Sequence, residues 1–174
     1  MFKLISKTIA AVAIVSVALF GSANAKTLKI ETHFTASSPN GEVAAQFAKN
    51  VEMFSGGSLK IEMFYSSSVT GKSAEVFNSA QTGIIDCDMT GAGYQTGKNA
   101  AFQFAGDVMG GYDNPYQQYD FLKFPGAQDA VDALYNKYGM TLIGWWIPGH
   151  ESLISSKPIP DVASIKDFKF RSPP

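Results

Sequence analysis

In the first half of the chain, segments with the period of strands alternate with segments with the period of helices. Residues 28–32 and 59–63 alternate apolar and polar side chains, as half-buried strands do, and residues 84–89 predict a third strand. The segments between them, 41–55 and 73–82, predict helices. Connections this short favour parallel strands joined by right-handed crossovers. The sequence therefore predicts an α/β fold, a parallel-rich sheet flanked by helices.

The first predicted helix has clear start and stop signals. The run Ser-Ser-Pro-Asn at residues 37–40 supplies cap and turn residues, and Gly56 and Gly57 suit its C-terminal end. Its expected inward face has apolar residues at spacings of four, four and three: Val43, Phe47, Val51 and Phe54. This spacing predicts an amphipathic helix with that face against the sheet.

The second half of the chain predicts further helices and two more strands. Asn114 followed by proline predicts a helix over residues 115–123. A second helix is expected to bury one face, made of Val131, Leu134, Tyr135 and Tyr138. The apolar run at residues 140–146 predicts a buried strand, and residues 152–156 predict a short one. We assign no regular structure to residues 99–112.

The N-terminus predicts a leader for export. Lys3 and Lys7 precede an apolar run at residues 9–20, and Ala-Asn-Ala at residues 23–25 has the small side chains of a cleavage site. The run is too short to span a bilayer comfortably. We therefore expect residues 1–25 to be a signal peptide, the alternative being an uncleaved anchor helix. After its removal we expect a soluble protein without membrane insertion.

Charge and cysteine content narrow the function classes. Removing the leader takes away two lysines and no acid, so the formal net charge falls from −1 to −3. A mildly acidic exported protein without a basic cluster is a poor candidate for binding nucleic acid. Cys87 is the only cysteine, so no intrachain disulfide can form. We expect its thiol to be buried and inert, because it lies between Asp86 and Asp88 on a strand.

Arg171 is the strongest candidate for ligand contact. It is the only arginine among 14 basic residues. Its planar fork can bind a carboxylate through two parallel hydrogen bonds, which lysine cannot do. The alternative is an exposed arginine without a ligand. Tyr94 follows the third predicted strand at its carboxyl end, where ligands bind in open α/β sheets, and is therefore a candidate pocket wall.

Several catalytic and cofactor motifs are incomplete. Gly-Lys-Ser at residues 71–73 resembles the end of a phosphate-binding loop, but Ser66 stands where the motif needs glycine. His150 precedes a glutamate as in zinc proteases, but Ile154 occupies the position of the second histidine. His33 is the only other histidine, which excludes a site built on several histidines.

Five stretches together resemble the solute-binding proteins of tripartite ATP-independent periplasmic (TRAP) transporters. They are the glycine pair at 56–57 before a strand, S-V-T-G-K-S-A-E-V-F-N-S-A-Q-T-G-I-I-D-C-D-M at 68–89, G-Y-D-N-P-Y-Q-Q-Y-D-F-L at 111–122, G-W-W-I-P-G-H-E-S-L-I-S-S-K-P-I at 144–159 and I-K-D-F-K-F-R-S-P-P at 165–174. The resemblance is to the DctP-like family and covers essentially all of the mature chain. The double tryptophan and Y-D-N-P resemble the subgroup that binds 2-oxo acids and other monocarboxylates.

The resemblance implies a periplasmic-binding-protein-like fold of type II, with two α/β lobes that close on the ligand. It implies three parts: the signal peptide at 1–25, the first lobe at 26–150, and a hinge with the start of a second lobe at 151–174. Family members continue for roughly as much chain again, so we expect an N-terminal fragment with most of the second lobe absent.

The resemblance also assigns roles to individual residues. Arg171 falls where the family arginine pairs with the ligand carboxylate. Glu151 falls where keto-acid binders present a polar side chain to the ligand or to its bound cation, sodium or calcium. Tyr94 falls near the wall of the first lobe, and Phe34 and Trp146 are further ligand contacts. No catalytic residue and no organic cofactor are implied.

The predicted function is that of a periplasmic solute-binding protein that captures a small carboxylate and delivers it to a TRAP membrane permease. One alternative is a secreted enzyme that uses Asp86, Asp88 or Glu151 as general acid or base, since the first two share a strand face. Another alternative is a fragment that binds no ligand.

Overall fold

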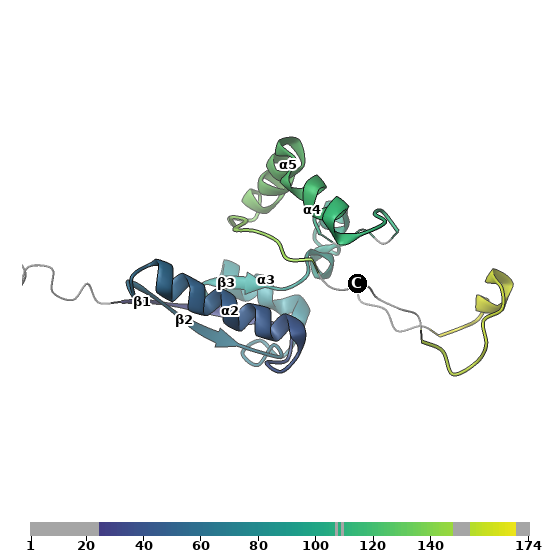
Figure 1. Ribbon diagram of the computed structural model, residues 1–174, viewed down its shortest axis with the longest axis horizontal. Helices are drawn as coiled ribbons and strands as arrows, with labels where there is room; N and C mark the ends of the chain where they lie inside the picture. The colour runs from purple at the N-terminus through teal and green to yellow at the C-terminus, as the bar shows by residue number, and fades with distance from the viewer. Residues whose placement is uncertain (1–24, 107, 109, 148–153, 170–174) are drawn as a thin grey trace, which may run out of the picture.

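The computed structural model describes residues 25–106, 108, 110–147 and 154–169 of the chain (Figure 1). The main elements are, in order, β1 (Lys26–Thr32), α2 (Pro39–Phe54), β2 (Leu59–Phe64), α3 (Val76–Gln81), β3 (Cys87–Met89), α4 (Pro115–Lys123) and α5 (Pro125–Asn136). Short 3-10 helices are η1 (Ser73–Glu75), η2 (Ala92–Gln95), η3 (Ala100–Phe104) and η4 (Val162–Ile165). Within these residues no helix is long and apolar enough to cross a membrane.

The strands form one parallel, three-stranded sheet in the order β2-β1-β3. In this register Glu31 of β1 lies between Phe64 of β2 and Asp88 of β3. The chain thus passes from the central strand to one edge and then back across β1 to the other edge. Right-handed crossovers along that path put α2 and α3 on opposite faces, and α2 lies along the sheet in Figure 1. The predicted α/β fold is confirmed.

Local signals set both ends of α2. The Oγ of Ser38 accepts a hydrogen bond from the Gly41 N–H at 3.1 Å, which satisfies one of the free donors of the first turn. Pro39 takes the first helical position, where its missing N–H is not needed. Gly56 and Gly57 follow the helix with φ of 61° and 80°, the left-handed region that glycine adopts without strain.

The buried face of α2 differs from the predicted one. Its buried residues are Gly41, Ala44 and Ala48, whereas Val43 is 52% and Phe54 80% exposed. Spacings of three and four residues put the small side chains on one face. Their size lets the helix backbone lie close to the strands, so large side chains are displaced to the flanks of the contact.

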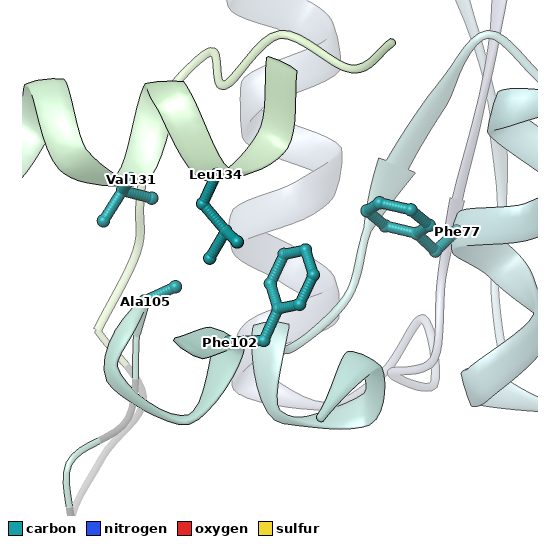
Figure 2. Packing of buried hydrophobic residues seen from close by; sticks show 5 residues of the cluster. All are labelled: Phe77, Phe102, Ala105, Val131 and Leu134. Atoms are coloured by element: carbon teal, nitrogen blue, oxygen red, sulfur yellow. The ribbon is translucent and has the colours of Figure 1, made fainter. Parts of the chain in front are cut away.

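A hydrophobic cluster joins α3, η3 and α5 and consists of the buried residues Phe77, Phe102, Ala105, Val131 and Leu134 (Figure 2). The rings of Phe77 and Phe102 meet edge to face with centroids 5.7 Å apart, and Phe102 meets Tyr135 in the same way at 5.2 Å. Such pairs contribute about 0.5–1.5 kcal/mol beyond the burial of their area. The predicted inward face of α5 is confirmed, since Tyr135 and Tyr138 also pack against the cluster.

Two predicted strands are corrected. β3 covers only Cys87–Met89, because the N–H groups of Ile84 and Ile85 donate to the Ser79 carbonyl of α3 at 2.9 Å and 3.4 Å. The expected strand at residues 140–146 is absent. Met140, Leu142 and Trp145 pack instead against the hydrophobic cluster from an irregular segment. A short apolar run can pack against a core either as a strand or as an irregular segment, and the periodicity of the sequence does not distinguish the two cases.

Two other stretches also differ from expectation. η3 lies within residues 99–112, for which no regular structure was predicted, and the Asn99 side chain caps it by accepting from Ala101 N–H at 3.0 Å. Residues 154–156 of the predicted strand at 152–156 are not in a strand, and residues 152 and 153 lie outside the described residues.

Candidate ligand-binding site

The carboxyl ends of the strands meet at one edge of the sheet because all of them are parallel. Residues 33–38 leave β1 there, residues 65–72 leave β2, and residues 90–94 leave β3. In open α/β sheets this edge is where ligands bind. The candidate site is therefore built from the loops that follow the strands.

Four rings from three separate segments contact one another at this edge and form what we call the aromatic cluster: His33, Phe34, Tyr94 and Trp146. The His33 ring lies 3.9 Å from Phe34 and meets Tyr94 edge to face at 5.3 Å, measured between centroids. Phe34 in turn lies 5.5 Å from Trp146. All four side chains are half-buried. The structure thus brings together Phe34, Tyr94 and Trp146, three of the residues singled out from the sequence.

The two adjacent tryptophans have different surroundings. Trp145 packs against the hydrophobic cluster, and its Nε1–H donates to the carbonyl oxygen of Ala105 at 3.2 Å. Trp146 contacts Phe34 in the aromatic cluster instead. Trp145 therefore anchors the irregular segment to the core, and its neighbour is held at the sheet edge.

His33 is the member of the aromatic cluster that sequence reasoning missed. Its Nδ1 is buried and has no hydrogen-bond partner among the described residues. Burial lowers the pKa of His33 from its usual value, so the ring is neutral near pH 7. A single histidine matches no motif, and its burial depends on rings that are distant in sequence.

Glu31 is a buried acid beneath this edge, at the end of the central strand. Its Oε1 accepts hydrogen bonds from the backbone N–H groups of Val69 at 2.6 Å and Thr70 at 3.3 Å. Its Oε2 is buried and has no partner within the described part of the chain. Glu31 therefore ties the loop after β2 to β1. The alternation of β1 marks Glu31 as a solvent-facing residue, so its burial could not be predicted from the sequence.

Asp88 lies directly opposite Glu31 in the sheet register. Burial raises the pKa of Asp88 to about 6, and the nearby Glu31 charge acts in the same direction. A hydrogen bond from the Thr90 hydroxyl to Asp88 Oδ1, at 2.6 Å, opposes that rise. Two acids thus lie opposite each other near the carboxyl ends of β1 and β3.

The loop after β2 has unusual backbone conformations close to the aromatic cluster. Ser66 and Ser67 have φ of 57° and 50°, in the left-handed region that residues with a Cβ rarely adopt. Ser66 N–H donates to the Phe34 carbonyl at 2.9 Å, and Ser67 N–H donates to the Thr32 carbonyl at 3.1 Å. These bonds hold the strained loop against the chain that carries His33 and Phe34. Strain of this kind is concentrated at functional sites.

Asp86 and Asp88, considered above as an acid and base pair, have different roles in the structure. Asp86 is exposed, and its Oδ2 accepts from the Lys29 N–H at 2.8 Å, which ties it to β1. Cys87 between them is half-buried, whereas it was predicted to be buried. Burial, and then the charges of Asp86 and Asp88, raise the pKa of the Cys87 thiol, and this direction agrees with the prediction.

Two of the predicted site residues, Glu151 and Arg171, lie outside the described residues. Within the described ranges, no group of three or more His, Cys, Asp or Glu side chains is placed to hold a metal ion. The geometry on this edge therefore consists of the aromatic cluster, with the acids Glu31 and Asp88 on the adjoining strands. Such a surface can enclose a small ligand and exclude water from it.

Comparisons with known proteins identify relatives of this chain. The family model described as "Bacterial extracellular solute-binding protein, family 7" (DctP) matches residues 30–174. No curated protein matches.

Several solved structures are similar to the chain. A TRAP periplasmic solute-binding protein from Rhodobacter sphaeroides, in an apo open form, is 27% identical with a TM-score of 0.63; the match covers 68% of this chain and 37% of that one. The protein from Pseudoalteromonas atlantica with bound sodium and pyruvate is 20% identical, with a TM-score of 0.61 and coverage of 67% and 35%. The protein from Bordetella bronchiseptica with calcium and picolinate is 22% identical, with a TM-score of 0.59 and coverage of 66% and 34%.

This chain thus spans little more than a third of the length of its solved relatives. The family match nevertheless begins within β1 and runs through every later element of the fold to residue 174. On this evidence the chain belongs to the DctP family of bacterial extracellular solute-binding proteins, the family of TRAP transporter solute-binding proteins.

Proposed function

We propose that this protein captures a small carboxylate, a 2-oxo acid or related monocarboxylate, in the periplasm and delivers it to a TRAP membrane permease. The observation that carries the proposal is the aromatic cluster. Its rings come from the loops after β1 and β3 and from residue 146, and they contact one another at the carboxyl edge of the sheet. Aromatic walls and a few polar groups are the usual lining of a site for a small ligand.

The choice of a monocarboxylate rests on the resemblance of the double tryptophan and of Y-D-N-P to the binders of 2-oxo acids and other monocarboxylates. The solved relatives hold ligands as different as pyruvate, succinate and sn-glycerol-3-phosphate, so likeness to them does not choose the acid.

Arg171 and Glu151 complete the proposed site. Arg171 would take the carboxylate through a bidentate pair of charge-assisted hydrogen bonds. Glu151 would bind the ligand or a sodium or calcium ion held with it. Two relatives support a cation, one with bound sodium and pyruvate and one with copurified calcium and picolinate. Export through cleavage of residues 1–25 is part of the proposal, and so is closure of a second lobe over the ligand.

Calorimetric titration of the exported protein with 2-oxo, 2-hydroxy and dicarboxylic acids tests the proposal. The protein should be expressed from its natural gene and purified from the periplasm. We expect binding of monocarboxylates, weakened about ten- to a hundredfold by Arg171→Lys, because one charge-assisted bond is lost. Trp146→Ala should weaken the same binding by removing an aromatic wall.

A matched control is available in the same segment. Ile143 is 74% exposed and lies three residues before Trp146, so Ile143→Ala should leave affinity unchanged. Tight binding that survives both Arg171→Lys and Trp146→Ala would show that the site lies elsewhere. A folded protein that binds none of these acids would overturn the proposed function, and turnover of an acid would favour the enzyme instead.

A further inference from the structure

The polar member of the aromatic cluster has no role in the proposed function so far. His33 lies between Phe34 and Tyr94, with ring centroids 3.9 Å and 5.3 Å away. It leaves the central strand at the carboxyl edge, directly after Thr32. A polar group held among rings at this position is unusual unless it serves a partner, because burying it without a hydrogen bond costs free energy.

The surroundings of the ring decide which nitrogen carries its proton. Nδ1 is buried and has no partner among the described residues. A buried N–H donor without an acceptor is rarer in proteins than an unused acceptor lone pair. The proton is therefore better placed on Nε2, the other ring nitrogen. Burial also lowers the pKa of His33, which favours the neutral ring.

The neutral ring offers one hydrogen-bond donor to a ligand, the Nε2–H. A carbonyl or hydroxyl oxygen next to the ligand carboxylate can accept this hydrogen bond.

We propose that His33 is a specificity-determining residue whose Nε2–H donates a hydrogen bond to the 2-oxo or 2-hydroxy oxygen of the bound acid. This inference rests on the proposed function. It makes His33 the residue that distinguishes a 2-oxo acid from the same acid without the oxygen at C2. A site that hydrogen-bonds a substrate oxygen rejects the analogue that lacks it, because the donor is then left unpaired.

Pyruvate, lactate and propionate form the test set, because they share three carbons and a carboxylate and differ at C2. We expect the protein to bind pyruvate or lactate about tenfold more tightly than propionate, from the worth of one neutral hydrogen bond and the penalty for leaving it unmade. His33→Phe keeps a ring of similar shape without the donor. It should weaken pyruvate binding and leave propionate binding unchanged, so the preference disappears.

Two further variants separate specificity from structure. His33→Asn keeps an N–H donor on a short side chain and should keep part of the preference. Thr35→Val, at an exposed position in the same loop, should keep all of it. Equal loss of pyruvate and propionate affinity in His33→Phe would mean a purely structural role and would overturn the inference. An unchanged preference in that variant would overturn it as well.

A second measurement covers the case in which His33→Phe does not fold. Nitrogen NMR of the imidazoles in the unmutated protein reports the tautomer directly, and His150→Gln removes the signal of the only other histidine. Saturation with pyruvate should shift the His33 Nε2 signal, and saturation with propionate should not. Bound pyruvate without such a shift would refute the inference. A protein that binds neither acid would instead refute the proposed function.

Discussion

Gly41 allows a sharp test of how the loop of the site is held in place. It is buried in the first turn of α2, and its N–H donates to the capping Oγ of Ser38. A Cβ at this position would lie 2.0 Å from the carbonyl oxygen of Thr35 and 2.9 Å from its carbonyl carbon. Both contacts are with backbone, and ordinary van der Waals contact begins at 3.4 Å, so Gly41→Ala forces the helix start or the loop to move by at least 3.4 − 2.0 = 1.4 Å.

The size of the effect follows from two opposing terms. Replacing glycine by alanine in a helix is usually favourable by about 1 kcal/mol. Overpacking usually costs about 1–3 kcal/mol, and sometimes more. Relief is difficult here, because the Thr35 carbonyl also accepts from Ser38 N–H at 3.1 Å and Ser38 Oγ–H at 2.8 Å. Moving the carbonyl would weaken the cap, which contributes about 1 kcal/mol.

We therefore expect Gly41→Ala to destabilise the protein by about 1–3 kcal/mol, which is a fall of roughly 3–10 °C in Tm for a domain of this size. Thermal unfolding followed by circular dichroism measures it. The matched control is Gly144→Ala, whose Cβ would meet no atom within 4 Å and whose φ is not left-handed. The control should leave Tm unchanged or slightly raised. A Tm raised by Gly41→Ala, as helix propensity alone would give, would refute the reasoning.

Two further predictions concern the strand beside the site. Burial raises the pKa of Asp88 to about 6, above its value in the unfolded chain. The protonated form of Asp88 therefore contributes its whole share of the free energy of unfolding below about pH 4, and this share is lost as the pH rises through 6. Asp88→Asn should remove this pH dependence of stability and stabilise the protein at pH 7 by on the order of 2–3 kcal/mol. Denaturant unfolding at pH 5 and pH 7.5 measures the effect. An unchanged pH dependence in the variant would contradict the raised pKa of Asp88. Burial and the neighbouring acids raise the pKa of the Cys87 thiol. At pH 7.5, iodoacetamide should therefore label Cys87 much more slowly in the native state than in the denatured state. Equal labelling rates in the two states would contradict this prediction.

Local signals in the sequence were sufficient for most element boundaries. Asn114 and Pro115 begin α4 as predicted, and Ser38 caps α2, which starts at Pro39, two residues before the predicted start. Period-two alternation located β1 and β2, and their short connections gave the parallel order. These features depend on residues within one turn or one strand, so they can be read without knowing what packs against them.

Burial, by contrast, was decided by the tertiary structure. The apolar spacing of α2 predicted Val43 and Phe54 as inward residues, but Ala44 and Ala48 are the buried ones, because close packing of the helix favours small side chains. The apolar run at 140–146 did not become a strand; Met140, Leu142 and Trp145 pack against the hydrophobic cluster from an irregular segment instead.

The candidate site divides in the same way. Phe34, Tyr94 and Trp146 were named from the sequence, and the fold brings their rings together. His33 and Glu31 were not found, because what distinguishes them is a buried polar atom without a partner. That property exists only when segments far apart in the chain have met. The sequence by itself therefore determined the elements, their order and several candidate residues, and only the tertiary structure decided which polar groups lost their contact with water.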